Sequence, residues 1–167
     1  MPALYPGTQA PDIALPLARR GEKFSFSQAR HQGPVLAAFF KVSCPVCQLA
    51  FPFLERIHQA YKDKGFAIVG ISQDSATDTL QFAKTYGLTF PLALDDTNKF
   101  PVSNAYGLTN VPTLFWISPE GKIEFTCVGW DKKDMEQFNV RAAQAAGTQK
   151  VALFKAADAN LPDSKPG

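Results

Sequence analysis

The sequence predicts an α/β protein in which a mixed β-sheet carries helices on both faces. Three continuous apolar runs, at residues 35–40, 66–72 and 113–117, have the pattern of strands buried on both faces of a sheet. Amphipathic segments with helical spacing separate or follow them, and residues 122–128 return as a hairpin partner of the third run. Strands that alternate with helices and end in a hairpin indicate this mixed, layered architecture.

The segment before the first apolar run is predicted to add an N-terminal β-hairpin. Residues 12–17 and 22–26 are short strand-like pieces, and residues 19–21, Arg-Arg-Gly, form the turn between them. Ser27 is expected to cap a short helix over residues 28–31.

Three longer helices are expected around the sheet. The first covers residues 45–63 and contains Pro52, which should kink it. The second covers about residues 75–86 and the third about residues 131–146, and each is followed directly by a glycine that can end a helix.

Residues 1–167 are interpreted as a single domain. With 167 residues, 46% of them apolar, the chain is long enough to bury a sizeable core. The core of the domain should extend over about residues 9–146, and residues 148–167 form a C-terminal tail. From Leu161 onward this tail is expected to be irregular and mobile.

Composition and charge exclude several classes of partner. The net charge is only +2 and the charged residues are interspersed, so no nucleic acid is expected to bind. No run of about 18 apolar residues predicts a membrane span. The first residues lack a basic segment followed by an apolar core, so no signal peptide is expected. The protein should be cytoplasmic as given, or periplasmic if a leader has been removed, and a monomer.

The most informative motif is Cys44-Pro45-Val46-Cys47, at the junction between the first long strand and the first long helix. Three cysteines are too few for a disulfide-stapled scaffold, so the Cys-x-x-Cys spacing points to redox or metal chemistry. A structural zinc ion needs about four ligands. The other cysteine and the two histidines form no second paired motif, so no metal is expected.

The position of Cys44 suits a reactive thiolate. Cys44 would cap the helix, where the free N–H groups of Val46 and Cys47 and the helix dipole favour negative charge. Pro45 fits the first helical position but removes one N–H donor. Lys41 either adds a positive charge near the sulfur or extends into solvent. Lys41, Pro45 and Val46 are therefore the predicted tuning residues.

These motifs resemble a known family. The thioredoxin fold is indicated by Cys44-x-x-Cys47 after an apolar strand, by Pro52, by Val111-Pro112-Thr113 before a strand, and by Gly129 after a hairpin. Three further segments are more specifically similar to the AhpC/TSA-redoxin group, and within it to TlpA/ResA-like thiol:disulfide oxidoreductases. They are Ala10-Pro11-Asp12, Ile68-Val-Gly-Ile-Ser-Gln-Asp and Trp116-Ile-Ser-Pro-Glu-Gly-Lys-Ile.

The resemblance implies a three-layer α/β/α thioredoxin fold and a set of roles. Cys44 would be the nucleophile, and Cys47 the buried resolving thiol. Pro112 would be cis and lie against the disulfide, and the backbone of Val111 would pair with an extended substrate. Trp130 would line the substrate groove. The partners would be a protein disulfide or dithiol and an upstream thiol reductant or oxidant, with no cofactor.

The sequence also departs from the family pattern. Ser43 replaces the usual Trp before the first cysteine, and Pro45-Val46 reverses the common order of the intervening dipeptide. Peroxiredoxins carry Pro and Thr or Ser where this chain has Ala37 and Lys41, so a typical peroxiredoxin is not expected. Thioredoxin places a buried Asp where this chain has Ala38.

The missing buried carboxylate leaves no obvious base for Cys47. Glu55, Asp74 and Glu124 have the required charge, but their positions in the sequence do not favour them. We expect water or the leaving thiolate of the partner to take the proton. An unchanged pH profile of the resolving step in Ala38→Asp would contradict the idea that a base is limiting.

Two other functions remain open at this point. The chain could be a peroxide-reducing redoxin in which Cys47 resolves the oxidised Cys44, or a non-enzymatic thioredoxin-fold binding module with a regulatory disulfide. Cys127 is expected to fill space in the hairpin, with an additional redox role as the alternative.

Overall fold

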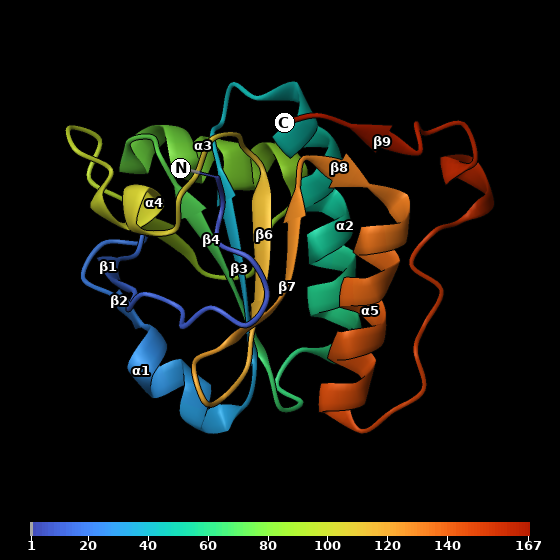
Figure 1. Ribbon diagram of the computed structural model, residues 1–167. Coiled ribbons are helices and arrows are strands. Elements are labelled where there is room, and N and C mark those ends of the chain that lie inside the picture. The colour runs from blue at the N-terminus through green and yellow to red at the C-terminus, as the bar shows by residue number, and fades with distance from the viewer. Residues whose placement is uncertain (1) are drawn as a thin grey trace.

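A computed structural model describes residues 2–167, and its centre is a five-stranded mixed sheet (Figure 1). Its strand order is β5-β4-β3-β6-β7. The central strand β3 (Val35–Phe40) is parallel to β4 (Ala67–Ser72), which is parallel to β5 (Leu92–Leu94). On the other side β3 is antiparallel to β6 (Thr113–Ile117), and β6 to β7 (Ile123–Val128). The predicted mixed sheet is confirmed.

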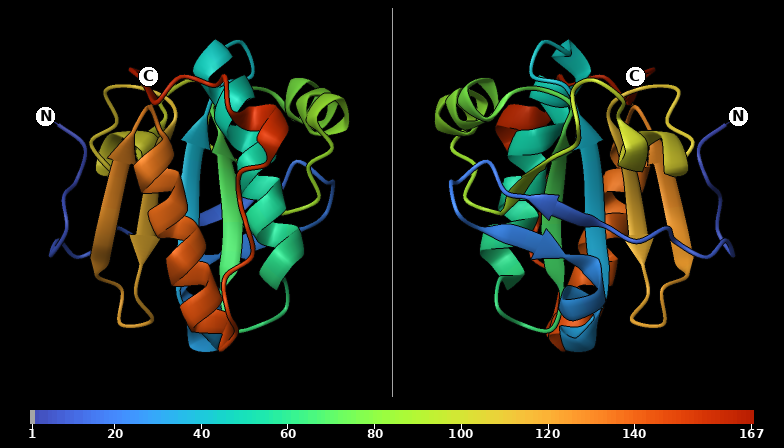
Figure 2. Two further views of the ribbon diagram at one scale, coloured as in Figure 1. Left: turned by 90° about the vertical axis from the view of Figure 1, so that its right-hand side faces the viewer. Right: turned by 90° about the vertical axis from the view of Figure 1, so that its left-hand side faces the viewer.

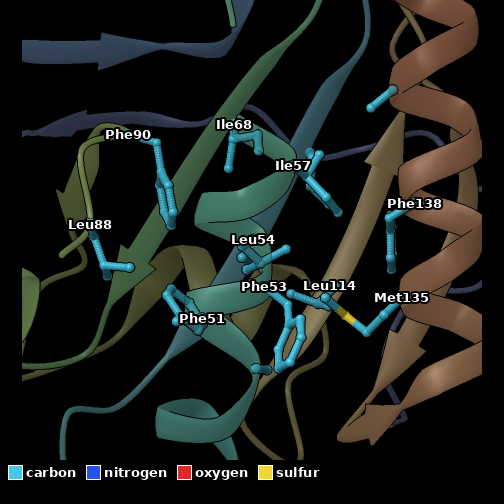
Figure 3. Close-up of a cluster of buried hydrophobic side chains, with 14 of the residues drawn as sticks. Phe51, Phe53, Leu54, Ile57, Ile68, Leu88, Phe90, Leu114, Met135 and Phe138 are labelled. Carbon is cyan, nitrogen blue, oxygen red and sulfur yellow. The ribbon is translucent and has the colours of Figure 1, made fainter. Parts of the chain in front are cut away.

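One face of the sheet is covered by three helices, α2 (Pro45–Tyr61), α3 (Ala76–Tyr86) and α5 (Lys132–Ala146). Figure 3 shows apolar side chains of α2 packed over the sheet, some directed toward α5 and Phe51 directed toward Leu88 and Phe90. The contributing side chains are Phe51, Phe53, Leu54 and Ile57 of α2, Met135 and Phe138 of α5, and Ile68 and Leu114 of the sheet. Pro52 lies inside α2, and the predicted helix continues on both sides of this proline.

The opposite face is covered by the N-terminal segment and a short helix (Figure 2). The elements there are β1 (Ala14–Pro16), β2 (Lys23–Ser25), α1 (Phe26–Ala29), the 3-10 turn η1 (Arg30–Gln32) and α4 (Pro101–Ala105). The antiparallel pairing of β1 and β2 confirms the predicted hairpin. The predicted cap of α1 was wrong by two residues, because the hydroxyl of Ser25, not Ser27, accepts the N–H of Gln28 at 3.4 Å.

The central strand separates two apolar clusters. Alternate side chains of β3 point to opposite faces, so Leu36, Ala38 and Phe40 face the three helices. Val35, Ala37 and Phe39 belong to the cluster under the hairpin. All six are 0% exposed, as the continuous apolar run predicts.

The C-terminal tail from Leu161 is largely irregular, as expected, but it packs against the domain and contains one short strand. Strand β9 (Ser164–Lys165) pairs antiparallel with β8 (Trp130–Asp131), and the 3-10 turn η2 (Ala156–Asp158) precedes it. Leu153 is buried, and Arg56 of α2 donates to its carbonyl at 3.1 Å. Apolar burial and backbone pairing therefore hold a segment whose composition is typical of a loop. Among residues 2–167, no helix has the length and apolarity needed to cross a membrane.

Candidate redox-active site

Cys44 lies between β3 and α2, directly before the first residue of α2. The residue has extended backbone angles (φ −80°, ψ 116°) and caps the helix, and Pro45 occupies the first turn. Its Sγ accepts the backbone N–H of Cys47 at 3.2 Å. A negative charge on this sulfur would therefore be stabilised by a direct hydrogen bond and by the helix N-terminus.

Cys47 lies one turn further into α2 and is 0% exposed. Burial raises the pKa of its thiol far above the ordinary value, because a thiolate there would lose its hydration. A backbone hydrogen bond with Lys41 acts in the opposite direction, whereas Cys44 and the charge of Asp74 raise the pKa further. The two thiols of the motif thus have different environments: Cys44 is half-buried and Cys47 is enclosed.

The loop before β6 approaches Cys44 from the other side. The peptide bond between Val111 and Pro112 is cis, as the family resemblance implied. The thiol of Cys44 donates to the carbonyl oxygen of Val111 at 3.3 Å, and Pro112 is buried. The N–H of Gly129 donates to the carbonyl of Pro112 at 2.8 Å. The fold therefore brings together three parts of the chain that are far apart in sequence.

The predicted tuning residues border the site at its surface. Lys41 and Pro45 are exposed and Val46 is half-buried. Lys41 also lies on the wall of an open groove of about 330 Å³ beside the loop before Pro112. The other lining residues of this groove are Gln73, Leu108, Thr109, Asn110, Val111 and Gly167.

Trp130 does not have the open position expected of a substrate-contacting residue. Its side chain is 1% exposed, and its ring packs at 5.2 Å from Phe53 and at 6.2 Å from Phe154 between ring centroids. Its Nε1–H donates to the carbonyl of Pro162 at 2.7 Å. The docked tail covers the indole, so this prediction is corrected: Trp130 is part of the core.

Asp74 lies closer to the site than its sequence position suggests. It follows β4, the parallel neighbour of β3, and the carboxyl ends of parallel strands meet at one edge of a sheet. Its Oδ2 accepts the backbone N–H of Val42 at 2.9 Å, two residues before Cys44. The available signal was an acidic residue directly after the second buried strand.

The third cysteine lies on a different element, the edge strand β7. Cys127 is buried on β7 opposite Leu114, and its Sγ lies 3.7 Å from the carbonyl of Gly129. Burial and the neighbouring carboxylate of Asp134 raise the pKa of this thiol. Within residues 2–167, no three His, Cys, Asp or Glu side chains are grouped so as to hold a metal ion.

A mixed sheet of this order, with a Cys-x-x-Cys pair opposite a cis-proline loop, defines a thioredoxin-like protein. The solved structure of a putative thiol:disulfide interchange protein DsbE from Chlorobium tepidum is similar, with a TM-score of 0.75 and 28% identity. The similarity covers 87% of this chain and all of that one.

Sequence comparison gives the family. The model of the AhpC/TSA family matches residues 6–126. The thioredoxin-like protein YneN of Bacillus subtilis is 35% identical over 136 residues, 78% of this chain and 76% of the relative. The thiol-disulfide oxidoreductase ResA of Bacillus thuringiensis is 28% identical over 129 residues, 77% and 72% of the two chains. The chain belongs to the AhpC/TSA family and is a thioredoxin-like thiol-disulfide oxidoreductase of the ResA/DsbE type.

Proposed function

We propose that this protein exchanges electrons with protein disulfides through Cys44 as nucleophile and Cys47 as resolving thiol. One observation carries the proposal. The sulfur of Cys44 caps α2, accepts the N–H of Cys47 at 3.2 Å and faces the carbonyl of Val111 at 3.3 Å, while Cys47 is buried. The half-buried thiol is the one that a partner can reach, and the enclosed thiol is the one held beside it.

The reducing cycle has two exchange steps. The Cys44 thiolate attacks one sulfur of the partner disulfide, forms a mixed disulfide and releases the other partner sulfur as a thiolate. The deprotonated Cys47 then attacks Cys44 Sγ, forms the Cys44–Cys47 disulfide and releases the second partner thiol. Two electrons and two protons pass from this chain to the partner. An upstream thiol reductant restores the dithiol, and the oxidising direction is the reverse sequence.

The backbone of the loop before Pro112 is proposed to hold the substrate. The carbonyl of Val111 already makes a hydrogen bond with Cys44, so a peptide paired with Val111 would present its cysteine to that sulfur. The substrate would then be an extended segment of a protein, and the chemistry needs no cofactor. The surface positions of Lys41, Pro45 and Val46 suit residues that adjust the rim of this contact.

Reduction of insulin disulfides by dithiothreitol tests the proposal. The wild-type protein should accelerate precipitation of the insulin B chain, and Cys44→Ser should reduce the rate to the uncatalysed background. Cys47→Ser should instead accumulate a mixed disulfide on Cys44, detectable by its mass. Full turnover by Cys44→Ser would contradict the assigned roles.

The reduction potential of the Cys44–Cys47 pair decides the direction of electron flow. A potential below about −250 mV would make the protein a reductant, and one above about −150 mV an oxidant. Equilibration with glutathione or dithiothreitol buffers, followed by thiol alkylation, measures it.

Peroxide reduction is the competing reaction in this family. Ala37 is buried in β3 and Lys41 is exposed, and neither side chain can supply the hydroxyl that peroxiredoxins place near the reactive cysteine. Peroxide consumption with a thiol donor should therefore be slow. Fast, Cys44-dependent consumption would favour the peroxidase function, and failure of both assays would leave a binding module.

A further inference from the structure

The end of the tail lies against the loop that faces Cys44. Strand β9 pairs with β8, which begins directly after Gly129. Figure 1 shows β9 at the end of the molecule where α2 begins. Beyond β9, the amide of Asn110 donates to the carbonyl of Gly167 at 2.9 Å. Residues 164–167 thus connect β8 to the loop before Pro112.

The contact with Val111 is close. A β-carbon at Gly167 would lie 2.6 Å from the carbonyl oxygen of Val111, so only a bare backbone fits in this place. The same oxygen accepts the thiol of Cys44 at 3.3 Å. Gly129 makes a similar approach, because a β-carbon there would lie 2.4 Å from the carbonyl oxygen of Lys165. The backbone of the tail therefore occupies the space beside the group proposed to pair with a substrate.

The contacts that anchor the C-terminal tail are distributed unevenly along its length. Upstream, Arg56 pairs with Asp158 at 2.7 Å, the indole of Trp130 donates to Pro162, and the N–H of Lys132 donates to Asp163 at 2.9 Å. Residues 164–167, in contrast, are all exposed and bury no apolar side chain. A segment with few buried contacts opens at low free-energy cost while its anchored base stays in place.

We propose that residues 164–167 form a strap that occupies the peptide-binding groove of this protein and must move before a protein substrate can pair with Val111. The inference rests on the proposed function and adds a segment of the same chain that competes with the substrate for the groove. The mode is strand addition, in which the chain's own backbone takes the place of an extended peptide. The strap lies outside residues 6–126, which match the family model.

A closed strap should slow the reaction of Cys44 with a peptide disulfide but not its reaction with a small disulfide. An extended peptide needs the groove, whereas a small disulfide needs only the sulfur of Cys44. If the strap is closed for nine-tenths of the time, the apparent rate constant for a peptide falls about tenfold. The rate constant for the small disulfide should change by less than about twofold.

The test compares the full chain with a chain that ends after Asp163, both in a Cys47→Ser background. This end point removes the strap but keeps the carbonyls of Pro162 and Asp163, which accept from Trp130 and Lys132. The probes are a free nitrobenzoate disulfide and a short extended peptide whose single cysteine carries the same nitrothiobenzoate group. Any accessible thiol releases this group, so the measurement does not depend on catalytic turnover.

We expect the peptide-to-small-disulfide ratio of rate constants to rise about tenfold in the shortened chain. Lys165→Pro in the full chain provides a second route, because proline cannot donate within the β8–β9 pairing and leaves the core untouched. It should raise the ratio in the same direction. An unchanged ratio in either folded variant overturns the strap. A raised ratio together with inactive wild-type protein in the insulin assay would overturn the proposed function alone.

Discussion

Cys44 and Cys47 are separated by two residues but differ in the solvation of their sulfur atoms. Cys44 is half-buried and its sulfur has an N–H donor, whereas Cys47 is fully enclosed between α2 and the sheet. A thiolate is costly where water is excluded, so the enclosed thiol of Cys47 holds its proton more strongly than a free cysteine thiol does. This difference in environment is the physical basis for assigning attack to one cysteine and resolution to the other.

The charge of Asp74 should slow deprotonation of Cys47. Its carboxylate raises the pKa of that thiol, so Asp74→Asn should lower it while keeping an acceptor for the N–H of Val42. The resolving step at pH 7 should become faster by roughly two- to fivefold, since one pKa unit changes the thiolate fraction tenfold. Rapid-quench decay of a mixed disulfide on Cys44, followed over pH, measures this.

Asp78→Asn is the matched control, because Asp78 is exposed in the first turn of α3. It should leave the pH profile unchanged. A slower resolving step in Asp74→Asn would contradict the prediction and would instead identify the carboxylate as the base for Cys47.

Cys127 should be dispensable for turnover. It is buried between the sheet and α5, and its thiol pKa is raised by burial, so it is a poor nucleophile at neutral pH. Cys127→Ala should keep insulin reduction within about twofold and lower the free energy of unfolding by about 1 kcal/mol through loss of packing. Urea denaturation and the insulin assay measure the two quantities. Loss of turnover in a variant of normal stability would show a redox role.

At the level of elements, an ion pair between η2 and α2 is one of the contacts that hold the tail. Asp158 accepts from Arg56 at 2.7 Å and from the backbone N–H of Lys155 at 2.7 Å. The hydrogen bond from Arg56 and then the one from Lys155 lower the pKa of the Asp158 carboxyl. Because Asp158 precedes the proposed strap, this ion pair should help to anchor the base of residues 164–167.

The contribution of Asp158 should therefore depend on pH. A carboxyl whose pKa is lower in the folded state stabilises that state above its unfolded pKa of about 3.9 and loses this effect as the pH falls through the folded value. Wild type should be more stable than Asp158→Asn at pH 6, and the difference should vanish in strong acid. Urea denaturation across pH measures it.

Asp163→Asn serves as the comparison for this pair. Asp163 is fully exposed and reaches Lys132 only at 4.0 Å, so this substitution should change stability little at any pH. A pH-independent difference between wild type and Asp158→Asn would contradict the assigned role of the ion pair.

For the whole molecule, stability rests on two apolar clusters separated by the sheet. Phe51 of α2 lies at the centre of one of them, with ring centroids of Phe40 and Phe82 at 4.4 and 5.8 Å. This packing joins α2, which carries both cysteines, to β3 and α3. The position of the redox pair is therefore coupled to the packing of the helical face.

Phe51→Ala should lower the free energy of unfolding by about 3–5 kcal/mol, because it leaves a cavity between the sheet and two helices. Leu80→Ala on α3 is the control, since Leu80 is 45% exposed and should matter by no more than about 0.5 kcal/mol. Urea denaturation measures both. Equal effects of the two substitutions would contradict this description of the core.

The sequence by itself determined the layered fold, the hairpin and the redox pair. These features depend on local pattern: continuous apolar runs mark strands such as β3, helical spacing marks α2, and the Cys-x-x-Cys motif at their junction needs no long-range information. The same locality explains why the helix cap of Asp131, with its side chain accepting from Asp134, follows from a few residues.

Only the tertiary structure decided where Trp130, Asp74 and residues 164–167 lie. Trp130 is buried because a tail some 30 residues later covers it, and its indole N–H donates a hydrogen bond to the carbonyl of Pro162. Asp74 reaches the site because β4 runs parallel to β3. The tail docks through contacts with residues more than 30 positions away, including Trp130 and Asn110. Contacts between segments so far apart in sequence leave no periodic signal in either segment, and only the folded chain brings them together.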